Sequence, residues 1–238
     1  MEERHTVLIL GVSGSPKHGA TSKALQICLN AAAQVPGVQT ACIDLAGKQI
    51  QCCTGCNACR NRGLDYCPVY QDDFCDTYMS LYLQCSGIIL ASPIYSMNPT
   101  GLLSNFLNRM RPSGGSKYPR SMAGMRVGGS IAVGGRRNGG QDTALAAMNS
   151  ALQSTGTNVV GGGVYFYNGA AVWSKNQREF DDPTGVLGLE AMGRKVAWLA
   201  KVIDAGLTVL DGKISNVNCA GFMSDTQMEQ ARKQLGLS

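Results

Sequence analysis

Four cysteines lie within fifteen residues of this chain, in the pattern C-x2-C-x2-C-x7-C followed directly by a proline. They are Cys53, Cys56, Cys59 and Cys67. A loop that returns a thiolate every third residue directs three ligands into one bowl, which the fourth thiolate closes. Bacterial ferredoxins use the same beginning and the same C-P ending with a shorter last spacer. The pattern therefore predicts a 4Fe-4S site.

Zinc, or cysteines that are free or disulfide-bonded, are the alternatives for this motif. Structural zinc usually draws on two C-x2-C knuckles held well apart, and the chain has only His5 and His18 to assist. Cys52 adjoins the motif and is a possible substitute for Cys53, but its spacing to Cys56 breaks the period. The spacing favours a cluster over zinc and makes Cys52 a spare thiol.

The composition indicates a soluble protein of a reducing compartment. Ten cysteines in 238 residues would suit a disulfide scaffold only in a short secreted chain, and residues 1–5 carry no apolar signal segment. No stretch approaches the roughly 18 uninterrupted apolar residues of a membrane span. The net charge of +5 and the sparse aromatics argue against a nucleic-acid binder. We expect a cytoplasmic protein with one domain over residues 1–238.

Positive charge is concentrated in one window. Residues 77–141 contain no acidic side chain but seven basic ones: Arg109, Arg111, Lys117, Arg120, Arg126, Arg136 and Arg137. Such a window indicates an anionic ligand or partner nearby, or an ordinary solvated face or subunit contact.

Short apolar runs alternate with helical patterns along the chain. We expect strands at 6–13, 38–45, 86–91, 125–134 and 157–165, and helices at 23–33, 72–84, 100–110, 141–154 and 186–210. This alternation predicts an α/β fold, a doubly wound five-stranded parallel sheet with helices on both faces. A cysteine-rich loop, residues 52–75, is inserted, and residues 211–238 form a C-terminal extension. Ligands of such sheets bind beyond the carboxyl ends of the strands, where loops 14–22, 92–100 and 134–140 are unusual.

Loop 14–22 has the features of a phosphate site. It leads from a strand into a helix, where unpaired amides and the helix dipole favour an anion. Gly14, Gly19 and Thr21 fit the nucleotide-triphosphate loop, but Ala20 stands where that loop needs lysine. The dinucleotide fingerprint is also absent, so a monophosphate such as that of FMN fits better than ATP. A capped glycine-rich turn without a ligand is the alternative.

The motifs taken together resemble one known family. These are G-S-P-K-H-G-A-T-S at 14–22, the four-cysteine run with the aspartates at 72 and 73, S-P-I-Y at 92–95 leading to G-L-L-S-N-F-L-N-R at 101–109, and G-G-R-R-N-G-G-Q at 134–141. In this order, over about residues 6–210, the chain resembles the iron-sulfur flavoproteins of the flavodoxin-like, NADPH-dependent FMN reductase superfamily.

The resemblance implies a flavodoxin-like fold that binds FMN, with a 4Fe-4S cluster on the four cysteines close to the flavin of a neighbouring subunit in a homodimer or homotetramer. By this likeness the FMN phosphate is held by Ser15, Lys17, Thr21 and Ser22. The isoalloxazine ring is lined by Pro93, Ile94, Tyr95, Ser96, Met97, Asn98, Gly134, Gly135, Arg136, Gly139 and Gly140.

The predicted function is that of an FMN-dependent oxidoreductase which passes electrons between the cluster and FMN. The expected electron donor is ferredoxin or NAD(P)H, and the acceptor a small molecule. The alternatives are an NAD(P)H-dependent FMN or quinone reductase whose cysteines hold zinc or nothing, and a non-catalytic flavodoxin-like electron carrier. No His, Asp or Glu stands out as a catalytic acid or base, so the catalytic residues and the substrate stay unassigned.

Overall fold

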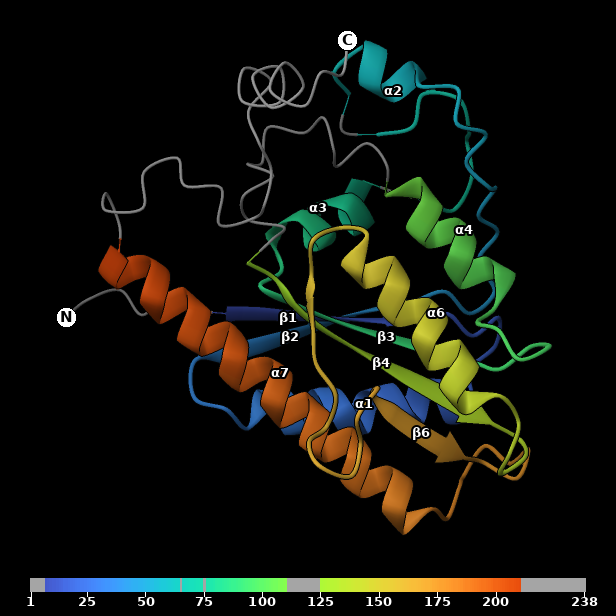
Figure 1. Cartoon of the computed structure of the whole chain (residues 1–238). Coiled ribbons are helices and arrows are strands. Elements are labelled where there is room, and N and C mark those ends of the chain that lie inside the picture. Colours follow the sequence, from blue (N-terminus) through green and yellow to red (C-terminus); the bar gives the residue numbers. More distant parts are fainter. Residues whose placement is uncertain (1–6, 65, 75, 111–124, 211–238) are drawn as a thin grey trace, which may run out of the picture.

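A parallel β-sheet forms the centre of the computed structural model, which describes residues 7–64, 66–74, 76–110 and 125–210 (Figure 1). The strands follow the order β2-β1-β3-β4-β5, with β6 also paired to β4, and these pairings are parallel. The strands are β1 (Val7–Ser13), β2 (Val38–Asp44), β3 (Gly87–Pro93), β4 (Val127–Gly134), β5 (Asn158–Val159) and β6 (Ala170–Trp173). This is the flavodoxin-like strand order, so the predicted fold is confirmed.

Helices cover both faces of the sheet (Figure 1). One face packs against α1 (Ala20–Ala33) and α7 (Pro183–Leu210), and the other against α3 (Asp76–Gln84), α4 (Gly101–Arg109) and α6 (Gln141–Gln153). Successive residues of β3 alternate between the two cores: Ile88 and Leu90 face one, Ile89 and Ala91 the other. Because both faces of the central strands β1, β3 and β4 are buried, these strands read as continuous runs of apolar and small residues rather than alternating ones.

The fifth sheet position differs from the single strand predicted at 157–165. Of the predicted strand, only the two residues of β5 pair with the first half of β4. The chain then leaves the sheet and returns as β6, which pairs with the second half of β4. Residues 161–163 are three consecutive glycines, which do not favour a strand, and the Gly162 amide instead donates to the Phe166 carbonyl (2.8 Å) across a turn.

The helix predicted at 72–84 is also corrected, because α3 begins at Asp76. Asp72 and Asp73 lie before it in a loop, where their carboxylates accept backbone amides of residues 49, 51 and 74. Aspartate side chains that bond nearby amides compete with helix formation. The short helix α2 (Ala58–Asn61) lies within the cysteine loop. In the ranges that the structure describes, no helix combines the length and apolar character needed to cross a membrane.

Candidate functional site

A cavity of about 430 Å³ opens at the carboxyl edge of the sheet. Residues of the three loops singled out in the sequence meet there, joined by a fourth segment. The lining residues are Ser15, Lys17, His18, Gly19, Ala20, Thr21, Pro93, Ile94, Tyr95, Val133, Gly135, Ser174, Asn176, Gln177 and Arg178. The volume lies in the range of small-molecule sites, and its place is where ligands of such sheets bind.

Loop 14–22 is held against the start of α4. The Gly14 amide donates to the Ala91 carbonyl (2.7 Å), and the Thr100 hydroxyl donates to the Gly14 carbonyl (2.6 Å). A Cβ at Gly14 would stand 2.5 Å from the Cβ of Leu103, so only glycine permits this approach. At the N-terminus of α1, Gly19 is the cap residue and supplies no side-chain hydrogen bond. The first amides of α1 therefore keep their capacity to bind an anion.

The side chains of this loop divide into two groups. Ser15, Lys17 and Thr21 line the cavity, and the Ser15 hydroxyl donates to the Lys17 carbonyl (2.6 Å), which fixes the turn. Ser22 does not line it, because its hydroxyl donates to the Asp44 carboxylate at the end of β2 (3.1 Å). His18 Nδ1 lies 3.1 Å from the same carboxylate oxygen. The Ser22 hydroxyl is thus bonded at the end of β2, and its role at the phosphate stays a prediction.

Loop 92–100 carries a strained turn at the cavity rim. The Tyr95 and Asn98 amides and carbonyls bond each other reciprocally (2.9 Å each) around Ser96 and Met97. Both central residues are left-handed, with φ of 49° and 65°. Such a conformation costs a non-glycine residue about 1–2 kcal/mol. Pro93 and the two residues after it line the cavity, whereas Ser96, Met97 and Asn98 form the exposed rim. Strain of this kind gathers at ligand sites.

Loop 134–140 is braced by one glutamine and touches the rim. The side chain of Gln141 donates to the Arg136 carbonyl (2.6 Å) and accepts from the Gly139 amide (2.8 Å). Gly140 has φ of 94°, and a Cβ there would stand 2.8 Å from Cα of Met97. Glycine at 140 therefore allows this loop to close onto loop 92–100. In the cavity itself, Gly135 is the residue of this loop that lines the wall together with the preceding Val133.

The four predicted ligand cysteines line one hollow, at the C-terminal end of α4. Cys59 is buried, Cys53 and Cys67 are half-buried, and Cys56 is exposed. Cys52 is exposed, does not line the hollow, and donates to the Cys53 carbonyl (3.6 Å), as expected for a spare thiol. Within the described residues, no three His, Cys, Asp or Glu side chains already stand in a metal-holding arrangement.

The donor set of this hollow suits a thiolate-bound centre. Among the residues that the structure describes, no histidine or carboxylate lines it, and the remaining walls come from Thr54, Asn57, Pro68, Val69, Tyr70, Asn108 and Arg109. The Gly55 amide donates to Cys53 Sγ (3.4 Å), a contact of the kind that stabilises a thiolate. Left-handed Gly55 (φ 69°) and Asn57 (φ 58°) curl the backbone between the first cysteines. The four sulfur ligands of this loop are therefore chemically suited to an iron-sulfur cluster.

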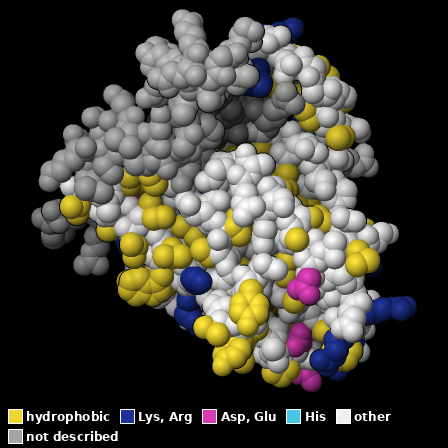
Figure 2. Space-filling model, in the orientation of Figure 1, with side chains coloured by type: hydrophobic (Ala, Val, Ile, Leu, Met, Phe, Trp, Pro, Cys, Tyr) yellow, Lys and Arg dark blue, Asp and Glu magenta, His cyan; other side chains and the backbone are white. Residues whose placement is uncertain are grey.

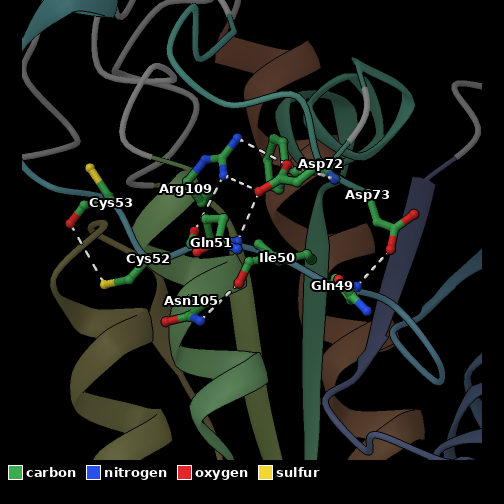
Figure 3. A network of polar contacts seen from close by, with 10 residues as sticks. Gln49, Ile50, Gln51, Cys52, Cys53, Asp72, Asp73, Asn105 and Arg109 are labelled. Atoms are coloured by element: carbon green, nitrogen blue, oxygen red, sulfur yellow. Dashed lines mark hydrogen bonds and ion pairs between the residues drawn. The ribbon is translucent and has the colours of Figure 1, made fainter.

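A buried ion pair clasps both ends of the cysteine loop to α4 (Figure 3). Arg109 Nη1 and Nη2 donate to the Asp72 carboxylate (2.6 and 3.3 Å), and Nη1 also donates to the Gln51 carbonyl (3.2 Å). Asn105 Nδ2 donates to the Ile50 carbonyl (2.8 Å). Burial by itself would raise the pKa of Asp72, but hydrogen bonds from Arg109, Gln51 and Phe74, with the guanidinium charge, hold that pKa below its usual value.

Comparison with known proteins identifies the family. Residues 7–171 match a family model described as NADPH-dependent FMN reductase. An iron-sulfur flavoprotein of Methanocaldococcus jannaschii is 33% identical over 198 residues, covering 82% of this chain and 98% of that protein. A second iron-sulfur flavoprotein of that organism is 34% identical over 71% of this chain and 83% of its own length. The chain belongs to the flavodoxin-like iron-sulfur flavoprotein family.

As a member of this family of FMN reductases and flavoproteins, the chain is an FMN-dependent oxidoreductase. A solved structure titled flavone reductase superposes with a TM-score of 0.60 at 21% identity. The match covers 83% of this iron-sulfur flavoprotein but 64% of that protein, and at this identity it shows the fold alone.

One segment of the cavity wall was not predicted from the sequence. Residues 174–178 follow β6 and form a turn in which the Gln177 amide donates to the Ser174 carbonyl (2.8 Å). The Ser174 amide donates to the Gly134 carbonyl (2.8 Å), and Asn176 packs against Gly135. The sequence signal for this segment is the short run A-A-V-W at 170–173 followed by polar residues. A fifth strand predicted at 157–165 leaves that run outside the sheet.

The four described cations of the basic window are placed differently from one another. Arg109 and Arg126 are buried, and Arg126 donates to carbonyls at the C-terminal end of α3. Arg136 is exposed, and the Arg137 guanidinium stacks over the Trp173 ring at 4.6 Å. Arg111, Lys117 and Arg120 lie outside the described residues. Two of the seven cations therefore serve the fold.

Proposed function

We propose that this iron-sulfur flavoprotein passes electrons between a 4Fe-4S cluster on Cys53, Cys56, Cys59 and Cys67 and FMN in the carboxyl-edge cavity. One observation carries the proposal: the four cysteines line a single hollow at one end of α4, and the other end of α4 begins beside the cavity. Nine residues at 1.5 Å each make α4 about 14 Å long. One short, capped helix thus links both sites rigidly.

A cluster of this type exchanges single electrons, whereas FMN exchanges either single electrons or a hydride, so the pair would connect one-electron and two-electron partners. The chain's own groups would bind and orient the flavin. The amides at the start of α1, with the side chains of Lys17 and Thr21, would supply donors for the phosphate, and Ser15 would shape the turn through its bond to the Lys17 carbonyl. Loops 92–98 and 134–140 supply the walls for the ring, and their mutual packing at Gly140 keeps the walls together.

Ferredoxin is the donor that we favour. Arg60 and Arg62 are exposed on the cysteine loop beside the proposed cluster. An acidic protein would be steered to such a surface, and steering weakens as the Debye length falls from about 10 Å at 0.1 M salt to about 3 Å at 1 M. Stopped-flow reduction of the flavin should slow with salt and with Arg60→Glu/Arg62→Glu. A salt-independent rate would remove the support for this donor.

An NAD(P)H-dependent FMN or quinone reductase is the second candidate, favoured by the description of the matching family model. In that case the nicotinamide would reduce FMN directly, without a cluster, and a small acceptor would follow in the same cavity. This alternative would be supported if the purified protein lacks iron and if NADPH reduces its flavin faster than ferredoxin does.

We also propose that the chain forms a homodimer or homotetramer. Apolar side chains are exposed along the outer side of α7 and on the adjoining excursion 160–169, and hydrophobic atoms gather over α7 (Figure 2). Leu187, Trp198, Val202 and Val209 are each more than half exposed, and their spacing returns to one helical face. Exposed apolar patches of this kind mark protein interfaces. Sedimentation of the wild type and of Trp198→Glu tests the interface.

The cluster assignment is tested with a matched pair of cysteine variants. Cys56→Ala removes a proposed ligand, so anaerobically purified protein should lose iron and acid-labile sulfide while it keeps FMN. Cys52→Ala removes an adjacent thiol that lies outside the hollow, and its iron content should equal that of the wild type. Full iron in Cys56→Ala, or zinc in the wild type, would overturn the assignment.

A further inference from the structure

The arginine that lines the four-cysteine hollow has a buried donor atom, Nε, without a hydrogen-bond partner among the described residues. Arg109 is 2% exposed, and its Nη1 and Nη2 are taken by Asp72 and by the Gln51 carbonyl. Its Nε is buried and has no hydrogen-bond partner in the described part of the chain. A buried donor without a partner costs about 1–3 kcal/mol. Such a buried donor in a native site points to a ligand that it binds or to another functional role.

The ion pair is also asymmetric with respect to the hollow. Arg109 lines the hollow and Asp72 does not, although the two side chains are comparably buried, at 2% and 7% exposed. The rings of Tyr70 and Phe74 flank the guanidinium at 5.0 and 5.1 Å from their centroids, which keeps water away and fixes its plane. Arg109 is therefore the member of this ion pair that borders the four-cysteine hollow.

We propose that Arg109 is the counter-charge of the cysteine centre: its Nε–H donates to a sulfur of the bound cluster, and its charge raises the reduction potential of that cluster. The inference rests on the proposed function and adds a positioning and tuning residue to it. Four thiolates around an iron-sulfur core carry net negative charge, and reduction adds one electron. A fixed cation and an N–H···S bond stabilise the reduced state more than the oxidised one. Asp72 moderates the effect by holding Arg109 from the far side.

The proposed role of Arg109 predicts that two substitutions in this ion pair shift the reduction potential of the cluster in opposite directions. Asp72→Asn leaves Arg109 uncompensated, so the cluster should become easier to reduce. Arg109→Gln in the Asp72→Asn background removes the cation, so the cluster should become harder to reduce than in Asp72→Asn. We expect each step to change the reduction equilibrium about tenfold or more, which is about 59 mV for one electron. Asp73→Asn is the matched control, because Asp73 contacts the Gln49 amide and not Arg109.

The experiment is an anaerobic redox titration of the full chain, followed by electron paramagnetic resonance of the reduced cluster. If the double variant does not fold, Arg109→Met/Asp72→Leu removes the same two charges with apolar side chains. The inference fails if Asp72→Asn shifts the potential no more than Asp73→Asn, or if the charge-free pair does not lower it relative to Asp72→Asn. Iron and sulfide are measured first in the wild type. Their absence would refute the proposed function itself, whereas a full cluster with an unmoved potential refutes only the role of Arg109.

Discussion

Gly140→Ala should separate the two loops that wall the flavin ring. The residue has φ of 94°, and an added Cβ would stand 2.8 Å from Met97 Cα, a backbone atom that cannot turn aside. The left-handed conformation costs alanine about 1–2 kcal/mol. Overpacking typically adds about 1–3 kcal/mol. The conformation in which loops 92–98 and 134–140 touch is thus penalised by about 2–5 kcal/mol.

If binding requires that conformation, the penalty appears in the dissociation constant. A cost of about 2–5 kcal/mol corresponds to roughly 30-fold to 4,000-fold weaker flavin binding. Fluorescence titration of the apoprotein with FMN and with riboflavin measures it. Both flavins should lose affinity equally, because the clash lies in the ring walls rather than at the phosphate loop.

Two glycine controls separate the sources of this effect. Gly47 has φ of 73° with no atom within 4 Å of an added Cβ, so Gly47→Ala introduces backbone strain without a clash. Gly101 has neither a left-handed φ nor a neighbour within 4 Å. Both variants should bind flavin nearly as the wild type does. Gly140→Ala with an unchanged dissociation constant would refute the view that these loops must touch to hold the ring.

Three further outcomes are expected. Lys17→Ala should weaken FMN binding about 10-fold to 150-fold, the value of one charge-assisted hydrogen bond of about 1.5–3 kcal/mol, but leave riboflavin unaffected; equal losses in fluorescence titrations would contradict the phosphate assignment. Asp72→Asn should destabilise the protein by about 3–5 kcal/mol at pH 7, because Arg109 is left buried without its partner. Since the folded pKa of Asp72 is lowered, its stabilisation is present above the unfolded value of about 3.9 and is lost as the pH falls through the folded value. Urea unfolding should therefore show the difference shrinking in acid, and a pH-independent difference would exclude the pair as its cause. Arg126→Met removes a cation that donates to the carbonyls of Tyr82 (2.6 Å) and Cys85 (3.2 Å), so urea unfolding should show a loss of about 2 kcal/mol with unchanged FMN affinity. A stability equal to that of the wild type would argue against a stabilising role of these two hydrogen bonds.

Local signals were enough to predict much of this protein. Apolar runs of strand length, separated by helical periods, predicted the parallel sheet, because helices bury both faces of the central strands. The spacing of the cysteines predicted that four thiols share one hollow and that Cys52 stays outside it. The glycine-rich loops were located correctly at the carboxyl edge, since parallel strands bring their ends to one side.

Contacts between distant segments were beyond the reach of sequence reasoning. Asp72 looked like the first turn of a helix, but its carboxylate is held by Arg109, 37 residues away. Ser22 is a predicted phosphate ligand, and the structure adds a hydrogen bond from its hydroxyl to Asp44 at the end of the neighbouring strand. Segment 174–178 reaches the cavity because β6 pairs with β4. The glycine-rich residues 161–163 before β6 make this pairing hard to predict from the sequence.

The difference between what the sequence predicts and what only the structure shows has a physical cause. Backbone conformation and hydrophobic period are properties of neighbouring residues, so the sequence by itself determined the strands, the helices, the cysteine motif and the edge at which the loops gather. The choice of partner for a buried polar group depends on which segments the fold brings within hydrogen-bonding distance. Only the tertiary structure decided that Arg109 borders the cysteine hollow, that its buried Nε has no partner among the described residues, that the Ser22 hydroxyl bonds Asp44 at the end of β2, and that glycine at 140 permits the close approach of Met97.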